Sequence, residues 1–233
     1  MTDDPRRLIV GAAPAPDPSG HYGRLIAHAS TLIAADGGLL ACLAAGRVPD
    51  LCIGDFDSTP PEALARVAAA GAEVRRYPVV KNVSDLDLAV EAVRGIGGGP
   101  VTLCAAFSGR LDHTLAALGT LCSAVDLDVV ADEPGWIGVP LDSEARPSCT
   151  LTLPPDTVVS LFAINGSARV SVGGFEYGLD GAVLAPLSSH GLSNVTRDET
   201  QWVRVESGAA LVIANRAAEP LTLQSVLAIT DIL

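Results

Sequence analysis

Short apolar runs alternate with stretches of helical spacing along the first part of the chain. The apolar runs predict strands at Leu8–Ala12, Thr31–Ala35, Leu51–Ile53, Glu73–Tyr77, Val101–Ala106 and Asp128–Ala131. Alternation of this kind is typical of a parallel sheet with helices on its faces. We therefore predict an N-terminal α/β domain with a Rossmann-like parallel sheet over residues 1–144.

Helix start and stop signals lie between these runs. A helix over Pro61–Ala70 begins with proline and ends before Gly71, and a helix over Leu86–Ile96 ends before a glycine-rich segment. Proline at the start and glycine after the end are common helix signals. A third predicted helix, Leu111–Val125, is apolar almost all round. We expect this helix to be buried.

The pattern changes beyond about Leu141, where residues 142–148 have the composition of a linker. Alternating, β-branched runs then predict strands at Thr157–Ala163, Ala168–Val172, Trp202–Glu206 and Ala209–Ala214. Turn signals fall at Asn165-Gly166, Gly173-Gly174, Asp180-Gly181 and Ser207-Gly208. This pattern predicts a second domain, an all-β sandwich over residues 145–233.

The composition narrows the classes of partner. A net charge of -12 disfavours nucleic acid and anionic membranes. An acidic protein still binds phosphates through backbone N–H groups, a few arginines and metal ions held by carboxylates. The N-terminal apolar run is too short for a signal peptide, and no apolar stretch has the length of a transmembrane helix. We therefore expect a cytoplasmic protein with a metal-using site.

The five cysteines are scattered along the chain and never form a Cys-x-x-Cys pair. An odd number without paired spacing argues against a disulfide framework and against zinc. We expect these cysteines to be core residues.

The strongest local signal for chemistry is Gly54-Asp55-Phe56-Asp57-Ser58. Residues two apart on extended backbone project to the same side, so Asp55 and Asp57 aim two carboxylates at one point beyond a strand. Such a pair is suited to Mg²⁺, and ligands of open parallel sheets bind beyond the carboxyl ends of strands. The alternative is a turn in which Asp57 caps the next helix.

Ala35-Asp36-Gly37-Gly38 follows an earlier predicted strand. Glycines without Cβ atoms allow a phosphate or nucleotide to approach the backbone. A plain turn is the alternative.

The segment from Lys81 to Asp87 has a strong structural interpretation, because Ser84 and Asp87 form a near capping box. We accept that role for Asp87. Asp85 is then free to join a carboxylate cluster, and Lys81 is placed either to neutralise phosphate charge or to remain a solvated lysine.

Ser108-Gly109-Arg110-Leu111-Asp112-His113 lies between a predicted strand and a predicted helix. A helix N-terminus, a guanidinium and a glycine together favour a phosphate. Alternatively, Asp112 is a first-turn acid that the helix dipole favours, and His113 is an ordinary helix residue.

The order of these segments resembles the thiamine pyrophosphokinase family. The family carries Ala-Asp-Gly-Gly, Gly-Asp-Phe-Asp-Ser, Lys-Asp-x-Thr-Asp, Gly-Gly-Arg-x-Asp-His and, in a β domain, Gly-Ile-Ser-Asn. The matching residues here are 35–38, 54–58, 81–85, 108–113 and Gly191-Leu192-Ser193-Asn194. The resemblance implies a homodimer that uses ATP and thiamine with Mg²⁺, in which a nucleotide-binding domain is joined to a β sandwich.

The resemblance also implies roles for residues. Mg²⁺ ligands would be Asp55, Asp57 and Asp85, which with Arg110 form the catalytic set. The nucleotide site would comprise Asp36, Gly37, Gly38, Lys81, Ser84, Arg110, Asp112 and His113. Ser193 and Asn194 would belong to the thiamine pocket.

This sequence departs from the family pattern at Asn82, Ser84, Ser108, Ala117 and Val195. Ser84 keeps the hydroxyl of the usual threonine, whereas Asn82 and Val195 stand where acids are usual. These departures leave open a pyrophosphokinase for another small alcohol, such as a pterin or a thiamine analogue, or a non-catalytic nucleotide or thiamine sensor. An aspartate-nucleophile phosphatase, which uses Asp-x-Asp, is a further alternative, although its nucleophile normally follows the first strand.

Overall fold

The computed structural model describes residues 7–13 and 20–216. The chain is a mixed α/β protein that divides into two compact units, residues 1–133 (unit 1) and 134–233 (unit 2). The functional boundary after residue 144 stays a prediction, and the chain beyond Arg216 lies outside the described residues.

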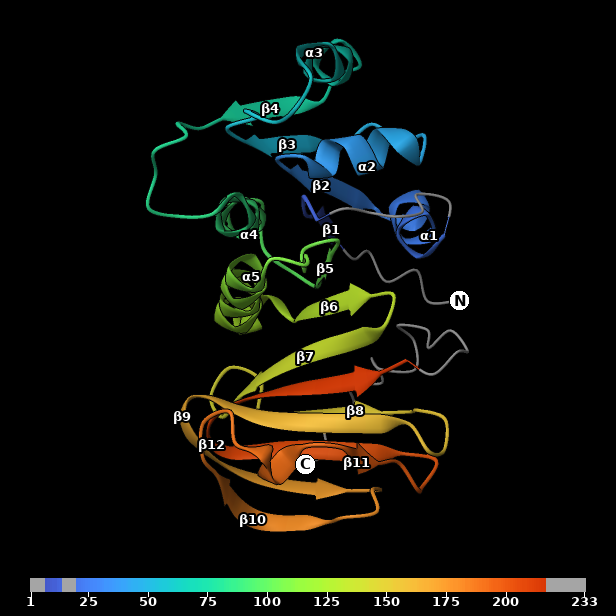
Figure 1. Ribbon diagram of the computed structural model, residues 1–233, viewed down its shortest axis with the longest axis vertical. Coiled ribbons are helices and arrows are strands. Elements are labelled where there is room, and N and C mark those ends of the chain that lie inside the picture. The colour runs from blue at the N-terminus through green and yellow to red at the C-terminus, as the bar shows by residue number, and fades with distance from the viewer. Residues whose placement is uncertain (1–6, 14–19, 217–233) are drawn as a thin grey trace. The chain divides into compact units, whose positions relative to one another are not determined.

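Unit 1 contains the strands of a parallel sheet and its helices (Figure 1). Its strands are β1 (Arg7–Val10), β2 (Thr31–Ala35), β3 (Leu51–Gly54), β4 (Glu73–Arg76), β5 (Val101–Cys104) and β6 (Val129–Glu133). Its helices are α1 (His21–His28), α2 (Gly38–Ala44), α3 (Pro61–Ala69), α4 (Asp85–Gly95), α5 (Leu111–Ser123) and the short 3₁₀ helix η1 (Val125–Leu127). The predicted strands are therefore confirmed, and the structure adds α1 and α2, which are not among the predicted helices.

The strands of unit 1 pair in parallel in the order β6-β5-β1-β2-β3-β4. The order reverses between β1 and β5, and such reversals are where open α/β sheets bind ligands. In Figure 1, α1 and α2 lie on one side of this sheet and α4 and α5 on the other. Leu8 and Val10 pack with Ile26 and Leu39 in one core cluster, because alternate strand residues face the same side.

Helix α5 corrects one expectation. Its buried residues are Ala117, Thr120 and Leu121, whereas Leu111 and Leu115 are 72% and 57% exposed. The expected burial all round is therefore wrong. The helix packs through one face against α4 and β6, and an apolar composition alone does not show how many neighbours a helix has.

Unit 2 is built from antiparallel strands. They are β7 (Trp136–Asp142), β8 (Ser148–Leu151), β9 (Val158–Gly173), β10 (Leu179–Leu184), β11 (Asn194–Val195) and β12 (Gln201–Asn215), with the 3₁₀ helix η2 (Ser189–Gly191). Within this unit the strand order is β10-β9-β12-β7, β8 also pairs with β12, and β11 pairs with β9. The described part is all-β, and the sandwich arrangement stays a prediction.

Four predicted strands are in fact two long ones, β9 and β12. Asn165-Gly166 and Ser207-Gly208 were expected to be turns, but each lies inside a continuous strand where the β9–β12 register shifts. A Cβ at Gly208 would lie 2.6 Å from the Ser167 carbonyl oxygen, so the two strands approach closely at this bend. Here glycine marks a bulge rather than a hairpin.

The segment 142–148 is a closed turn and not an extended linker. Asp142 and Arg146 exchange two backbone hydrogen bonds of 3.0 Å each, and Asp142 Oδ1 accepts the N–H groups of Glu144 and Ala145. Asp142 thereby joins β7 to β8, which explains why polar residues gather there.

All five cysteines carry free thiols, and four are buried, as the sequence predicts. Within the described residues, no helix combines the length and apolar character needed to cross a membrane.

Candidate functional site

The carboxyl ends of β2 and β3 bring two acidic segments together. Ala35 pairs with Ile53, so Asp36 and Asp55 leave neighbouring parallel strands at the same edge of the sheet. The Asp36 N–H donates to the Ile53 carbonyl at 2.9 Å, which continues the ladder past β2. Two acids separated by about 20 residues in sequence are thus neighbours in the fold.

Asp36 organises the loop that follows β3. Its Oδ1 accepts the Phe56 N–H at 3.1 Å and its Oδ2 accepts the Ser58 hydroxyl at 3.3 Å. Gly54 has φ 153°, and a Cβ there would lie 3.1 Å from the Asp36 Cα. Glycine at this position therefore allows the two loops to pack together.

Asp36, Asp55 and Asp57 form a carboxylate cluster. Each offers an oxygen, and the three oxygens lie within 4.8 Å of one another. The Asp57 N–H also donates to Asp55 Oδ1 at 3.2 Å, which fixes the turn between the two acids. Clustered carboxylate oxygens are ligands suited to a hard cation such as Mg²⁺.

Asp85 is held beside this cluster by Lys81. The Lys81 ammonium lies 2.8 Å from Asp55 Oδ2 and 3.2 Å from Asp85 Oδ1, and its side chain is only 13% exposed. Lys81 is therefore a paired, largely buried lysine rather than a solvated one. The sequence predicts Asp85 as the third carboxylate beside Asp55 and Asp57. In the structure the third carboxylate within 4.8 Å is that of Asp36.

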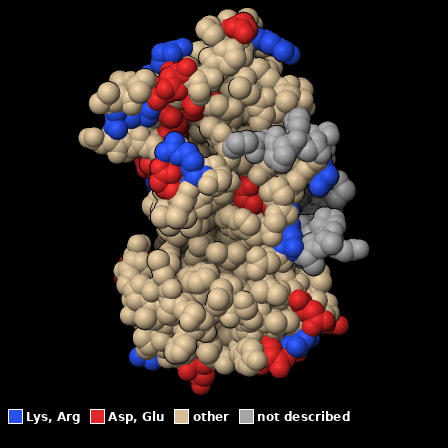
Figure 2. Space-filling view, viewed as in Figure 1, with Lys and Arg blue, Asp and Glu red and all other residues tan. Residues whose placement is uncertain are grey.

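The charges in this group stabilise one another. The hydrogen bond from Lys81 lowers the pKa of Asp55. Burial by itself would lower the pKa of Lys81, but its hydrogen bonds with Asp55 and Asp85 raise that pKa overall. Burial raises the pKa of Asp85. In Figure 2, acidic side chains flanked by basic ones gather over the ends of β3 and β4 beside the connection to α4.

Ser84 and Asp87 form the predicted capping box at the start of α4. Asp87 also accepts the Thr120 hydroxyl, which links α4 to α5. The accepted structural role of Asp87 is confirmed.

Gly38 has a packing reason beyond any ligand. A Cβ at this position would lie 2.1 Å from the Val10 carbonyl oxygen, whereas a Cβ at Gly37 would have 3.4 Å to Ala12. Gly38 therefore lets α2 start directly against the end of β1, whereas Gly37 has room for a side chain.

Arg110 and Asp112 follow β5, on the other side of β1 from β2. Their side chains pair at 2.6 Å and are 67% and 66% exposed. The hydrogen bond from Arg110 lowers the pKa of Asp112 to about 2. Asp112 lies in the first turn of α5, and His113 is exposed beside it. Both the phosphate interpretation and the helix-dipole interpretation are compatible with this position.

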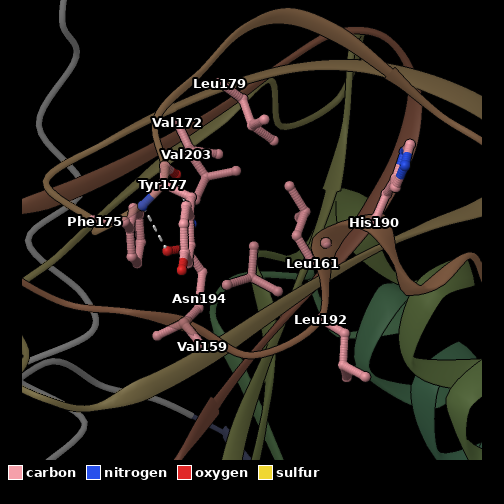
Figure 3. Close-up of a pocket in the computed structure, with 12 residues that line it drawn as sticks. Val159, Leu161, Val172, Phe175, Tyr177, Leu179, His190, Leu192, Asn194 and Val203 are labelled. Carbon is pink, nitrogen blue, oxygen red and sulfur yellow. Dashed lines mark hydrogen bonds between the residues drawn. The ribbon is translucent and has the colours of Figure 1, made fainter.

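Asn194 lines a cavity of about 80 Å³ in unit 2, whereas Ser193, its neighbour in the chain, is not part of the lining. The cavity lining is mostly apolar and includes Val159, Leu161, Phe175, Tyr177, Leu192 and Asn194. Figure 3 shows Phe175, Tyr177 and Asn194 on one side of the opening and His190 and Leu192 on the other.

The Asn194 amide holds the backbone of Tyr177. Its Oδ1 accepts the Tyr177 N–H at 3.0 Å, and its Nδ2 donates to the Tyr177 carbonyl at 2.7 Å. The preceding Ser193 has φ 58° and donates its N–H to the Ser160 hydroxyl. A Cβ at Gly191 would lie 2.0 Å from the Leu161 carbonyl oxygen, so the segment Gly191–Asn194 is packed tightly on β9.

Comparison with known proteins identifies the catalytic segment. Residues 22–131 match the family model described as thiamin pyrophosphokinase, catalytic domain. This segment of the chain carries the pattern of the thiamin pyrophosphokinase catalytic domain. No curated protein sequence matches it.

Solved structures of the thiamin pyrophosphokinase family share the fold. The Bacillus subtilis enzyme is 21% identical with a TM-score of 0.75, and the match covers 91% of this chain and 99% of that one. The Geobacillus thermodenitrificans enzyme is 20% identical with a TM-score of 0.74, and the match covers 92% of this chain and 99% of that one. The Candida albicans enzyme is 14% identical with a TM-score of 0.74, and the match covers 92% of this chain and 91% of that one. The fold likeness thus includes unit 2.

The match to the thiamin pyrophosphokinase catalytic domain contains the acidic segments from Asp36 to His113. Sequence reasoning missed Arg76, which lies in the same region. Arg76 pairs with Gly54 in the β3–β4 ladder, donates to the Asp55 carbonyl at 2.9 Å, and lies 5.5 Å from the Phe56 ring centroid. Arg76 stands near the end of the predicted strand Glu73–Tyr77, and this position is the signal by which the sequence could indicate it.

Proposed function

We propose that the chain transfers a pyrophosphoryl group from ATP to the hydroxyl of thiamine, giving thiamine diphosphate and AMP. This activity makes it a transferase of the kinase type, in line with the match of residues 22–131 to the thiamin pyrophosphokinase catalytic domain. The single observation that carries the proposal is the carboxylate cluster of Asp36, Asp55 and Asp57 inside the matched catalytic domain.

The carboxylate cluster fits Mg²⁺ in its chemistry, because the three residues offer only oxygen ligands. We assign Asp55 and Asp57 as ligands, with Asp36 in reach and Asp85 held beside them through Lys81. Held by these carboxylates, Mg²⁺ would supply positive charge that stabilises the phosphate groups of the nucleotide during transfer.

The remaining residues of unit 1 position and neutralise the nucleotide in this proposal. Lys81 keeps its charge and lies against the cluster, and Arg110 stands at the start of α5, where a helix N-terminus also favours phosphate. Gly37, Gly38, Ser84, Asp112 and His113 complete the proposed nucleotide site. Since the hydroxyl attacks the β-phosphorus directly, the reaction needs orientation and no covalent intermediate.

We assign the cavity at Asn194 to thiamine. Apolar walls with a few fixed polar groups are typical of small-molecule sites, and Asn194 supplies such a group here. Ser193 stays in the proposal as the residue that precedes Asn194 and holds this segment on β9. The proposal includes a Rossmann-like domain joined to a β sandwich in a cytoplasmic homodimer, as the family resemblance implies.

An acceptor assay tests this function. The wild-type protein is incubated with ATP, Mg²⁺ and either thiamine or a hydroxymethyl pterin, and AMP is quantified, with Asp55→Asn as the control. AMP formation that requires thiamine and Asp55 supports the proposal. AMP formation with the pterin alone would assign another acceptor, and thiamine binding without AMP would indicate a sensor.

A further inference from the structure

A buried carboxylate outside the proposed reaction lies at the same edge of the sheet. Glu133 is the last residue of β6 and is 4% exposed, and the neighbouring Asp132 is 1% exposed. The side chain of Asp132 pairs with His21 at 2.9 Å. Charged groups are rarely buried to this extent without a specific partner, so the contacts of Glu133 define its role.

Both oxygens of Glu133 are held by protein donors. Oε1 accepts the Ala106 N–H at 3.2 Å, and Oε2 accepts the hydroxyl of Tyr22 from α1. The carboxylate therefore links α1 to the chain directly after β5. Because both of its oxygens accept hydrogen bonds from the protein, it is not arranged as a ligand open to a metal ion.

Glu133 contacts the chain where it leaves β5 in an unusual conformation. Ala105 has φ 51°, in the left-handed region. Its carbonyl accepts the Ala13 N–H at 2.8 Å, and a Cβ at Gly11 would lie 2.6 Å from that carbonyl oxygen. The next donor, the Ala106 N–H, has no strand partner to continue the ladder, and Glu133 satisfies it.

The loop from Ala106 to Arg110 is short and anchored at both ends. At its far end the Ser108 carbonyl accepts the Thr114 hydroxyl at 2.8 Å, and the Ser108 hydroxyl accepts the Arg110 N–H at 3.2 Å. Glu133 supplies the anchor at the near end. The loop that leads to Arg110 is therefore held at its near end by a carboxylate that lies outside the loop.

We propose that Glu133, supported by Tyr22, is a positioning residue that fixes the Ala106–Arg110 loop and so places Arg110 for the phosphates of the nucleotide. This inference rests on the proposed function for the role of Arg110. It assigns a task to a buried acid that none of the family motifs quoted above contains.

A double-mutant cycle with Arg110 tests the proposal. Glu133→Ala is expected to lower kcat/KM for ATP by about 10-fold to 10²-fold, because small misplacements of a positioned group have effects of this size. The KM for thiamine should change less than about twofold, as should all parameters of the control Glu91→Ala, an exposed acid paired with Arg94. In an Arg110→Ala background, Glu133→Ala should have little further effect, because the positioned group is gone.

Glu133→Gln separates positioning from general stability. Its amide oxygen still accepts the Ala106 N–H, so it should retain most of the activity that Glu133→Ala loses. Equal losses with and without Arg110, or a Gln variant as impaired as the Ala variant, would overturn the proposal. If Glu133→Ala does not fold, the cycle with Tyr22→Phe decides by the same criterion, since it removes one hydroxyl from Glu133.

Direct ATP binding in the presence of Mg²⁺ keeps the two proposals distinct. If the wild type binds ATP but turns over no thiamine, the proposed function fails on its own. The positioning role still predicts weaker ATP binding for Glu133→Ala than for Glu133→Gln. Equal binding by the two variants would contradict it.

Discussion

The ammonium group of Lys81 lies 2.8 Å from the carboxylate of Asp55. Lys81 comes from the loop before α4 and Asp55 from the end of β3, so this ion pair joins two segments that the sequence separates by 26 positions. The same lysine reaches Asp85 at 3.2 Å. A single cation thus connects the carboxylate cluster to the start of α4.

Replacing Asp55 by asparagine tests the cluster. The change removes a charge without changing the shape, so turnover should fall by about 10²-fold or more, as expected for preorganised electrostatic groups. Steady-state kinetics at saturating Mg²⁺ measures the effect. Asp126→Asn, which alters an acid paired with Arg94 at 2.6 Å, is the control. Near-normal turnover in Asp55→Asn would remove Asp55 from the catalytic set.

Binding of Mg²⁺ should depend on the same carboxylates. A ligand that binds only the folded state raises the melting temperature. Mg²⁺ should therefore stabilise the wild type in the presence of ATP, and Asp57→Asn should reduce this shift. Thermal melts with and without Mg²⁺ provide the measurement. An undiminished shift in Asp57→Asn would assign the metal to other residues.

Gly191 should not tolerate a side chain. A Cβ there would meet the Leu161 carbonyl at 2.0 Å, so Gly191→Ala should lower the free energy of unfolding by about 1–3 kcal/mol or more. Gly135→Ala is the matched control, because nothing lies within 4 Å of its Cβ position. Urea unfolding compares the two variants. Equal stabilities would mean that the Gly191–Asn194 segment is not packed as described.

Asn194 should affect the acceptor and not the nucleotide. Asn194→Ala loses both hydrogen bonds to the Tyr177 backbone, at a cost of about 1 kcal/mol each. We expect a higher KM for thiamine with an unchanged KM for ATP. Asn215→Ala, which removes an exposed amide that donates to the Val158 carbonyl at 3.4 Å, serves as the control. A change confined to the KM for ATP would contradict the assignment of this cavity.

The stability of the wild type should depend on pH through Glu133. Burial raises its pKa above the usual 4.5. The folded state therefore favours the protonated form, and this contribution is complete below about pH 4.5 and is lost as the pH rises through the folded-state pKa. Glu133→Gln does not titrate there. The free energy of unfolding of the wild type, relative to Glu133→Gln, should fall as the pH is raised from about 4 to 7. A constant difference would contradict the raised pKa.

Periodicity predicted the strands of unit 1 because each strand is a short apolar run between helices. It failed at Gly208, since local turn chemistry does not distinguish a hairpin from a bend within two paired strands. It also failed at Leu115, because the number of neighbours around α5 depends on tertiary packing. Long-range pairing decides both features.

The candidate site was predicted segment by segment, and the structure refines how the segments meet. Asp55 and Asp57 project together as the spacing suggests, but only the register of β2 on β3 places Asp36 beside them. Glu133 comes two residues after the predicted strand Asp128–Ala131, just as Asp55 comes two residues after the predicted strand Leu51–Ile53. Its partner Tyr22 lies 111 positions away, so no local pattern connects the two.

One measurement tests the central claim most directly. A single turnover with wild-type protein, Mg²⁺, thiamine and ATP labelled separately at the β- and γ-phosphates follows both phosphorus atoms. Pyrophosphoryl transfer predicts that both labels appear together in thiamine diphosphate while unlabelled AMP is released. Transfer of the γ label alone, with the β label retained in ADP, would contradict the account.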